Sequence, residues 1–280
     1  MQCPAAARAT AFPLFAAVVA LGALGGFAPA PKGHVVNIVA RDFALELPAS
    51  IPAGLTIFQL KNLGQWGHHV TIVRLDSGHT AAEAFREIMK DGHGLRPEWL
   101  RPVGGPQHAP PGGVSNATVR LEPGSYLAFC EMPGPDGTSH YMRGMAKGFI
   151  VTGPAQPGRS AQGDDTLSLT EYAFTFAHPL TAGAHTIAVT NKGAQPHMVV
   201  LNRLPAGVTI DEFLAWTKDP KGKQPPAINT GGVTEIPPGA TVMFAQRFVP
   251  GRYALLCFST DTKDGKPHFA HGMAQMFVVR

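Results

Sequence analysis

Short apolar runs separated by turn residues dominate the chain and predict strands. Such runs alternate between apolar and polar positions or are rich in β-branched side chains, as half-buried strands are. Clear examples are residues 35–39, 56–60 and 185–189. Pro-Gly pairs at 123–124, 238–239 and 250–251 mark tight turns beside the later strands. The pattern predicts an all-β fold, either a β-sandwich or a Greek-key barrel.

One short helix interrupts the strands in each half of the chain. Thr80 with Glu83, and Thr209 with Glu212, fit the capping box, in which the two side chains satisfy each other's free backbone N–H groups. Apolar residues then recur at helical spacing, namely Phe85, Ile88, Met89, Phe213, Leu214 and Trp216. We expect each helix to have a structural role, lying over an open end of a barrel.

Two copies of one pattern run through the chain. The segment 62–75 aligns without gaps on 191–204, and six of the fourteen positions are identical. Pro123-Gly-Ser-Tyr-Leu-Ala-Phe-Cys130 then aligns on 250–257, and 140–151 aligns on 268–279. A repeat at this spacing, about 115 to 120 residues per copy, is the size of an ordinary domain.

The repeat sets the expected domain boundaries. We predict a first domain over residues 31–152, a linker over 153–164 and a second domain over 165–280. The linker is rich in Gly, Pro, Ala and Gln, a composition typical of linkers.

Residues 1–30 form a separate N-terminal segment. Arg8 is the only charge before an uncharged run from Ala11 to Ala28, and Ala28-Pro29-Ala30 offers a small-residue cleavage site. This pattern is typical of a secretory signal peptide. The run is also long enough to remain as an uncleaved N-terminal anchor. We expect an exported protein, periplasmic or extracellular, which an uncleaved leader would attach to a membrane.

Composition excludes several classes of protein. Hydrophobic residues make up 44% of the 280 residues, so the chain is not intrinsically disordered. Gly 32 and Pro 26 are high numbers for a helical protein and usual for a turn-rich β protein. The net charge of +4 comes without runs of Lys or Arg, so no nucleic-acid partner is expected.

Four residue types recur in both copies at matched spacing and could carry chemistry. They are His68, Cys130, His140 and Met145 in the first copy, and His197, Cys257, His268 and Met273 in the second. In each copy a His opens one strand, the Cys closes another, and the second His and the Met lie on the loop into the last strand. All four can therefore meet at one end of the sheets.

The chemistry of these residues points to a metal. Two imidazoles and a thiolate with a weak thioether match the trigonal His₂Cys site of blue-copper electron-transfer proteins, whereas zinc prefers four strong ligands. A disulfide between Cys130 and Cys257 is not expected, because each would have to leave the equivalent place in its own copy. Cys3 lies in the leader.

Other histidines are weaker candidates. His68 is preferred over His69 because neighbours on a strand point to opposite faces and His68 aligns with His197. His69 is expected at the surface or behind the ligands, and His271 is expected to be exposed. His79, His93 and His108 have no match in the second copy, and a secondary metal site among them is a lesser alternative.

The motifs Asn-x-Gly-x-x-x-His, Pro-Gly-x-Tyr-x-x-x-Cys and His-x-x-x-Gly-Met resemble those of the cupredoxin (type 1 blue-copper) family, the group of plastocyanin and azurin. The resemblance covers essentially the whole exported chain, twice. It implies two tandem Greek-key β-sandwich domains, each with one short inserted helix and one copper held by the four residues of its copy. The residue after the first His is His69 or Met198, where several small cupredoxins have an Asn that braces the site.

Cupredoxin-fold enzymes add catalytic copper through His-x-His pairs and a His beside the type 1 Cys. No His-x-His occurs in this chain, and the residues flanking Cys130 and Cys257 are Phe129, Glu131, Leu256 and Phe258. The ligands of an O₂- or nitrite-reducing centre are missing, so the chain is not expected to be an enzyme.

The leading hypothesis is one-electron transfer to and from a protein redox partner, with His140 and His268 nearest that partner at the surface. The alternatives are copper binding and delivery without a redox role, a component of a cupredoxin-fold oxidoreductase, or a sensor or structural module that has lost one metal. In the last case, the first copy is the one expected to be altered.

Overall fold

The computed structural model describes residues 33–91, 96–155, 163–218 and 225–280. Over these residues the structure is all-β with two α-helices and two short 3-10 helices, so the predicted all-β class is confirmed. In the described part of the chain, no helix is long and apolar enough to cross a membrane. The predicted leader and His93 lie outside the described residues.

We call residues 33–155 the first repeat. Its elements are β1 (His34–Arg41), β2 (Ala44–Glu46), β3 (Ser50–Pro52), β4 (Gly54–Asn62), β5 (Thr71–Leu75), α1 (Ala81–Asp91), β6 (Leu100–Gly104), β7 (Val114–Leu121), β8 (Gly124–Phe129), a 3-10 helix (His140–Arg143) and β9 (Ala146–Thr152). Residues 163–280 are the second repeat. Its elements are β10 (Asp165–Thr170), β11 (Ala173–Phe176), β12 (Gly183–Asn191), β13 (His197–Leu204), α2 (Ile210–Lys218), β14 (Ile228–Ile236), β15 (Thr241–Phe248), β16 (Gly251–Leu256), a 3-10 helix (His268–His271) and β17 (Ala274–Val279).

Each repeat consists of two sheets. In the first repeat the strand orders are β2-β1-β4-β7 and β3-β9-β8-β5-β6, and in the second they are β11-β10-β12-β15 and β14-β13-β16-β17. The sheets pack through aromatic side chains: Phe58 of β4 contacts Phe149 of β9, with ring centroids 6.5 Å apart. Phe248 of β15 contacts Tyr253 of β16 in the same way, at 5.2 Å.

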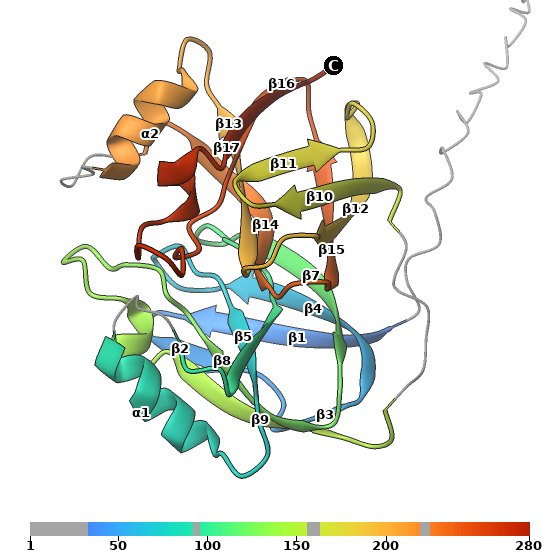
Figure 1. Ribbon diagram of the computed structural model, residues 1–280, viewed down its shortest axis with the longest axis vertical. Coiled ribbons are helices and arrows are strands. Elements are labelled where there is room, and N and C mark those ends of the chain that lie inside the picture. Colours follow the sequence, from blue (N-terminus) through green and yellow to red (C-terminus); the bar gives the residue numbers. More distant parts are fainter. Residues whose placement is uncertain (1–32, 92–95, 156–162, 219–224) are drawn as a thin grey trace, which may run out of the picture.

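The two repeats are not separated by solvent. Strands β7 and β15 pair antiparallel and join one sheet of each repeat into a single eight-stranded sheet. Asn116 of β7 strengthens this seam, because its side chain donates to the carbonyl of Ala245 and accepts from the N–H of the same residue, at 2.9 and 2.7 Å. One cluster of buried apolar side chains spans both repeats, which lie one above the other in Figure 1. The division of the chain into two domains with a linker stays a prediction.

Both Pro-Gly-x-Tyr motifs build the same corner. The hydroxyl of Tyr126 donates to the carbonyl of Glu122 at 2.7 Å, and the hydroxyl of Tyr253 donates to that of Val249 at 3.0 Å. The N–H of Glu122 donates back to the Tyr126 oxygen at 3.1 Å. Such a tyrosine corner fixes the start of the strand that leads to each Cys.

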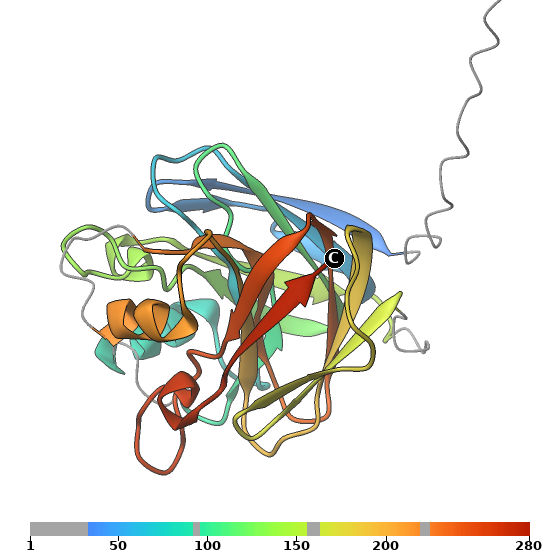
Figure 2. The same cartoon turned by 90° about the horizontal axis from the view of Figure 1, so that it is seen from above.

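The two helices begin at the predicted capping boxes. The Thr80 N–H donates to the Glu83 carboxylate at 2.8 Å while the Glu83 N–H donates to the Thr80 hydroxyl at 3.2 Å. Thr209 and Glu212 make the same pair of bonds, at 2.7 and 3.1 Å. Figures 1 and 2 show α1 and α2 on the same side of the molecule.

The predicted place of α1, over an open barrel end, is wrong. Side chains alternate along β8, so that Tyr126 and Ala128 face the main core while Leu127 and Phe129 face outward. These two outward residues join Ala84 and Ile88 of α1 in a second buried cluster. The helix therefore covers the outer face of the β3-β9-β8-β5-β6 sheet. In the second repeat, Phe213 of α2 is buried in the main core cluster.

Candidate metal centres

In the first repeat, the four candidate ligands lie where strands begin or end. His68 stands shortly before β5, Cys130 directly follows β8, and Met145 directly precedes β9. Strands β5 and β8 are antiparallel neighbours with Thr71 opposite Phe129, so the start of one and the end of the other share an edge. His140 opens the 3-10 helix between β8 and β9 and completes the group at that edge.

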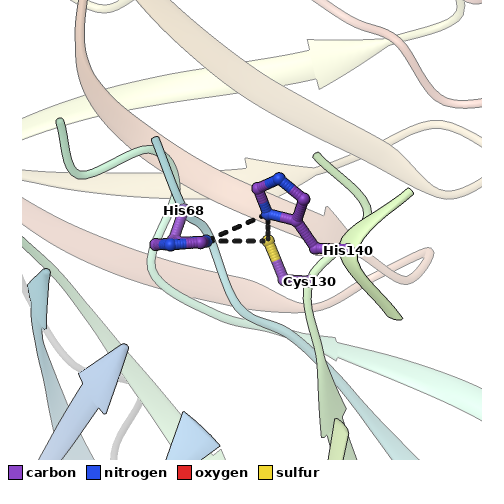
Figure 3. A group of neighbouring side chains, drawn as sticks. All are labelled: His68, Cys130 and His140. Atoms are coloured by element: carbon purple, nitrogen blue, oxygen red, sulfur yellow. Dashed lines mark hydrogen bonds between the residues drawn. The ribbon is translucent and has the colours of Figure 1, made fainter. Parts of the chain in front are cut away.

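Two imidazole nitrogens and one sulfur converge in the first repeat (Figure 3). Nδ1 of His68 lies 3.0 Å from Nδ1 of His140. The Cys130 sulfur lies 3.8 Å from the His68 nitrogen and 3.6 Å from the His140 nitrogen. All three residues are fully buried, at 0% exposure.

The second repeat builds the same group. The Nδ1 atoms of His197 and His268 are 2.9 Å apart. The Cys257 sulfur lies 3.9 Å from the first nitrogen and 3.5 Å from the second. These residues are also fully buried, so neither copy has lost its group.

The nitrogen–sulfur separations fit a shared metal ion, whereas the Nδ1–Nδ1 separations of 3.0 and 2.9 Å are shorter than the separation of about 3.5 Å in trigonal geometry. A metal held at about 2.0 Å from an imidazole nitrogen and about 2.3 Å from a thiolate sets a nitrogen and a sulfur about 3.7 Å apart in trigonal geometry. The four nitrogen–sulfur separations fall between 3.5 and 3.9 Å. Each group could thus hold a metal ion through its three ligand atoms.

Protonation also favours metal binding by the histidines. Burial lowers the pKa of His140 and of His197 to about 4, and it lowers the pKa of His68 and His268 as well. All four imidazoles are therefore neutral at pH 7 and have a lone pair for a metal.

The two thiols carry the proton that a metal would displace. Burial raises the pKa of Cys130 to about 12 and that of Cys257 to about 11. Both are free cysteines, as predicted, with no disulfide between them. A cation beside the sulfur favours the thiolate, so metal binding and thiol deprotonation are coupled here.

The two methionines belong to the same ends of the sheets. Met145 and Met273 are fully buried. The Cys130 N–H donates to the Met145 carbonyl at 3.1 Å, and the Cys257 N–H donates to the Met273 carbonyl at the same distance. Each Met therefore has its backbone fixed directly beside the Cys of its own group.

The Asn of each Asn-x-Gly-x-x-x-His motif holds the loop before the first His. The Asn62 amide donates to the carbonyls of Trp66 and Ala109, at 2.7 and 2.9 Å, and its oxygen accepts the Gly64 N–H at 2.8 Å. Asn191 makes the three equivalent bonds at 2.8, 2.9 and 2.9 Å. Both side chains are fully buried.

An acidic residue behind each first His was missed by the sequence reasoning. The Asp42 carboxylate lies 3.2 Å from Nε2 of His68 and accepts the backbone N–H groups of Gln65 and Trp66. A carboxylate on Nε2 fixes the tautomer that leaves Nδ1 free for a metal. Glu171 lies at the equivalent place in the second repeat, but its carboxylate is 3.9 Å from Nε2 of His197, beyond hydrogen-bonding distance.

The residues after these acids were missed as well. Phe43 and Tyr172 have positive φ angles of 65° and 63°, a conformation that costs an aromatic residue about 1–3 kcal/mol. The Phe43 ring meets His140 edge-to-face at 5.4 Å, and Tyr172 meets His268 at 5.5 Å. The two acid–aromatic pairs are 129 residues apart, the same offset as that of the first His of each group. That shared offset was the available signal in the sequence.

Other predictions about the histidines need correction. His140 and His268 are fully buried rather than placed at the surface. His69 needs no correction: it is buried, at 7% exposure, and lies behind the ligands, the second of its two expected places. His271 is half-buried and lies 3.1 Å from Asp264. His79 stacks on Trp99.

A third cluster, Asp261 with Asp264 and His271, also has the spacing of a metal group. Its carboxylates already have partners. The Asp261 carboxylate accepts hydrogen bonds from Tyr172 and Gln195, and Asp264 pairs with Lys266. Nothing further about this cluster points to a ligand.

The chain matches no family model and no curated protein. Among solved structures it is similar to auracyanin from Roseiflexus castenholzii, with 22% identity over 43% of this chain and 98% of that chain, at a TM-score of 0.32. It is also similar to the copper-containing nitrite reductase of Thermus scotoductus, with 11% identity over 89% of this chain and 61% of that one, at a TM-score of 0.25. The blue copper oxidase of Nitrosomonas europaea shows 14% identity over 89% and 86% of the two chains, at a TM-score of 0.27.

Each repeat thus has a pair of sheets, a tyrosine corner before the Cys and a buried His–Cys–His group at the sheet ends. These are the features that the resemblance to cupredoxins implies.

Proposed function

We propose that this protein binds two copper ions and transfers single electrons. In this proposal His68, Cys130, His140 and Met145 would hold one ion. His197, Cys257, His268 and Met273 hold the other. The observation that carries the proposal is the occurrence of two buried His–Cys–His groups with the same geometry.

The donor set favours copper over zinc. Two imidazoles, one thiolate and a weakly binding thioether form the trigonal site of blue-copper proteins. Structural zinc is instead held by four strong ligands. When bound, copper would supply a one-electron Cu(II)/Cu(I) couple.

The chain's own residues support a site that keeps its shape when the charge of the metal changes. Asn62 and Asn191 each fix the loop before the first His with three hydrogen bonds. The eight ligand residues themselves are also fully buried. Rigid, water-excluded ligands favour electron transfer over delivery, which needs a site that opens to release its metal.

An enzymatic role has less support. The positions after the two cysteines, where catalytic cupredoxins have a His, are occupied by Glu131 and Phe258. The Glu131 carboxylate is committed to Thr71 and to Arg96. We therefore propose an electron carrier that exchanges electrons with a protein partner, and we propose that residues 1–30 direct its export.

A chelation experiment separates electron transfer from delivery. The full chain is loaded with Cu(II), reduced with ascorbate, exposed to an excess of a Cu(I) chelator such as bicinchoninate, and then reoxidised. Electron transfer predicts that two coppers per chain remain and that the thiolate-to-copper absorption returns. Rapid loss of both ions to the chelator would contradict it and favour delivery. The variants Cys130→Ser and Cys257→Ser should each retain one copper.

A further inference from the structure

The two repeats meet beside both metal groups, at residues 104–109 and strand β14. The Thr234 N–H donates to the Gly105 carbonyl at 3.0 Å, and its hydroxyl donates to the Val70 carbonyl at 3.2 Å. The Gln107 N–H donates to the Gly232 carbonyl at 3.3 Å. This backbone contact fixes the position of Gln107 at the seam between the repeats.

The Gln107 side chain joins one residue from each repeat. Its oxygen lies 2.9 Å from Nδ1 of His69, and its nitrogen lies 3.9 Å from the sulfur of Met198. All three side chains are buried, with exposed fractions of 3%, 7% and 8% for Gln107, His69 and Met198. His69 and Met198 are equivalent positions of the repeat, directly after the first His of each group.

Both ends of this contact reach a ligand sulfur. The backbone N–H of His69 hydrogen-bonds the Cys130 sulfur. The backbone N–H of Met198 likewise donates to the Cys257 sulfur, at 3.4 Å. Cys130 and Cys257 are therefore connected through three residues, His69, Gln107 and Met198. The connection consists of four non-covalent contacts between buried residues.

The orientation of His69 is fixed from the other side of its ring. The Glu131 N–H donates to Nε2 of His69 at 2.9 Å, so a neutral ring carries its proton on Nδ1 and donates it to the Gln107 oxygen. Arg96 in turn bridges the carboxylates of Glu131 and Glu235. Because Glu235 belongs to the second repeat, this ion pair locks Glu131 across the same seam.

We propose that His69, Gln107 and Met198 form an internal path that carries an electron between the two metal groups. This inference rests on the proposed function of the two groups as copper sites. With copper bound in both groups, one group would lose one electron and the other would gain it, so no further reactant would be needed and no proton would leave the chain. The protein then acts as a two-centre electron relay rather than as two independent carriers.

The test uses the full chain with its two sites made distinguishable. Met273→Gln replaces one weak axial ligand by another and shifts the potential and spectrum of the second site. After a flash-photolytic pulse that reduces less than one site per chain, absorbance at the two site bands is followed over time. The path predicts a redistribution phase whose rate does not depend on protein concentration.

Substitution of the central residue tests the path itself. Gln107→Leu, in the Met273→Gln chain, should slow the redistribution at least tenfold with two coppers still bound. Met198→Leu is a second variant that breaks the same contact with a side chain of similar volume. Thr234→Val is the matched control: it removes a buried hydrogen bond across the same seam but lies off the path, and its rate should stay within twofold.

Each other outcome has a distinct meaning. The path is overturned if no redistribution phase occurs in a doubly loaded chain, if Gln107→Leu and Met198→Leu both leave the rate unchanged, or if Thr234→Val slows it equally. Failure of the proposed function looks different, because the single-site variants Cys130→Ser and Cys257→Ser would then show no thiolate-to-copper band in steady-state spectra. That result would remove both proposals.

Discussion

Asn62 anchors the loop that carries His68, a ligand residue of the first metal group. Its fully buried side chain makes three hydrogen bonds, at 2.7, 2.9 and 2.8 Å, to the loop before His68 and to Ala109. Each such bond contributes about 1 kcal/mol net. We predict that Asn62→Ala lowers the free energy of unfolding by about 3 kcal/mol, which corresponds to a fall of roughly 6–12 °C in Tm.

The substitution should weaken copper binding in the first metal group only. In the Cys257→Ser chain, where the first group alone can bind copper, Asn62→Ala should weaken copper binding at least tenfold, since about 1.4 kcal/mol suffices for that factor. Asn191→Ala is the matched control, because it removes the equivalent three bonds from the second repeat. In the Cys257→Ser chain it should leave the copper affinity of the first group unchanged.

Thermal unfolding of the metal-free chain and copper titration of the single-site chain supply the two measurements. A loss of less than about 0.5 kcal/mol together with unchanged copper affinity would refute the reasoning, because surface substitutions without structural consequence fall in that range. Equal weakening by Asn191→Ala would show that the two loops are not independent.

Three further predictions follow from the described contacts. Copper binding should release one proton per site, because burial keeps both thiols protonated and the imidazoles neutral. The copper affinity should therefore rise about tenfold per pH unit between pH 6 and 8. A copper affinity that does not change with pH would contradict this prediction. Arg96→Met should lower the free energy of unfolding by about 3–5 kcal/mol, measured by denaturant unfolding, because it leaves the buried carboxylates of Glu131 and Glu235 unpaired. An unchanged free energy of unfolding would argue against the ion pair. Thr80→Ala should lower the free energy of unfolding by about 1 kcal/mol, because it removes the capping box at α1. An unchanged unfolding midpoint would show that the capping box does not stabilise the chain.

The repeat made much of the architecture predictable. Paired Cys, His and Met residues at matched spacing placed both groups at strand ends, because a residue that only fills a core is free to change between copies. The capping boxes and the Pro-Gly-x-Tyr corners were equally visible, since each depends on residues close together in sequence. That these groups bind copper stays a proposal.

Contacts between distant segments could not be predicted in this way. The pairing of β7 with β15 joins strands with ordinary apolar patterns, and nothing in either strand specifies its partner across the repeats. The place of α1 depends on outward-facing side chains such as Phe129. Alternation along a strand shows which face of the sheet such a residue lies on, but not which helix or sheet packs over that face. The acid–aromatic pairs beginning at Asp42 and Glu171 were missed because their side chains change type between copies.

The visible absorption spectrum of the copper-loaded chain, taken with a copper count, shows whether the two buried groups bind copper through their thiolates. We expect two coppers per chain and an intense thiolate-to-copper band, which Cys130→Ser and Cys257→Ser should each reduce by about half. Copper bound without that band, or no copper at all, would contradict the claim that the two buried His–Cys–His groups are copper–thiolate centres.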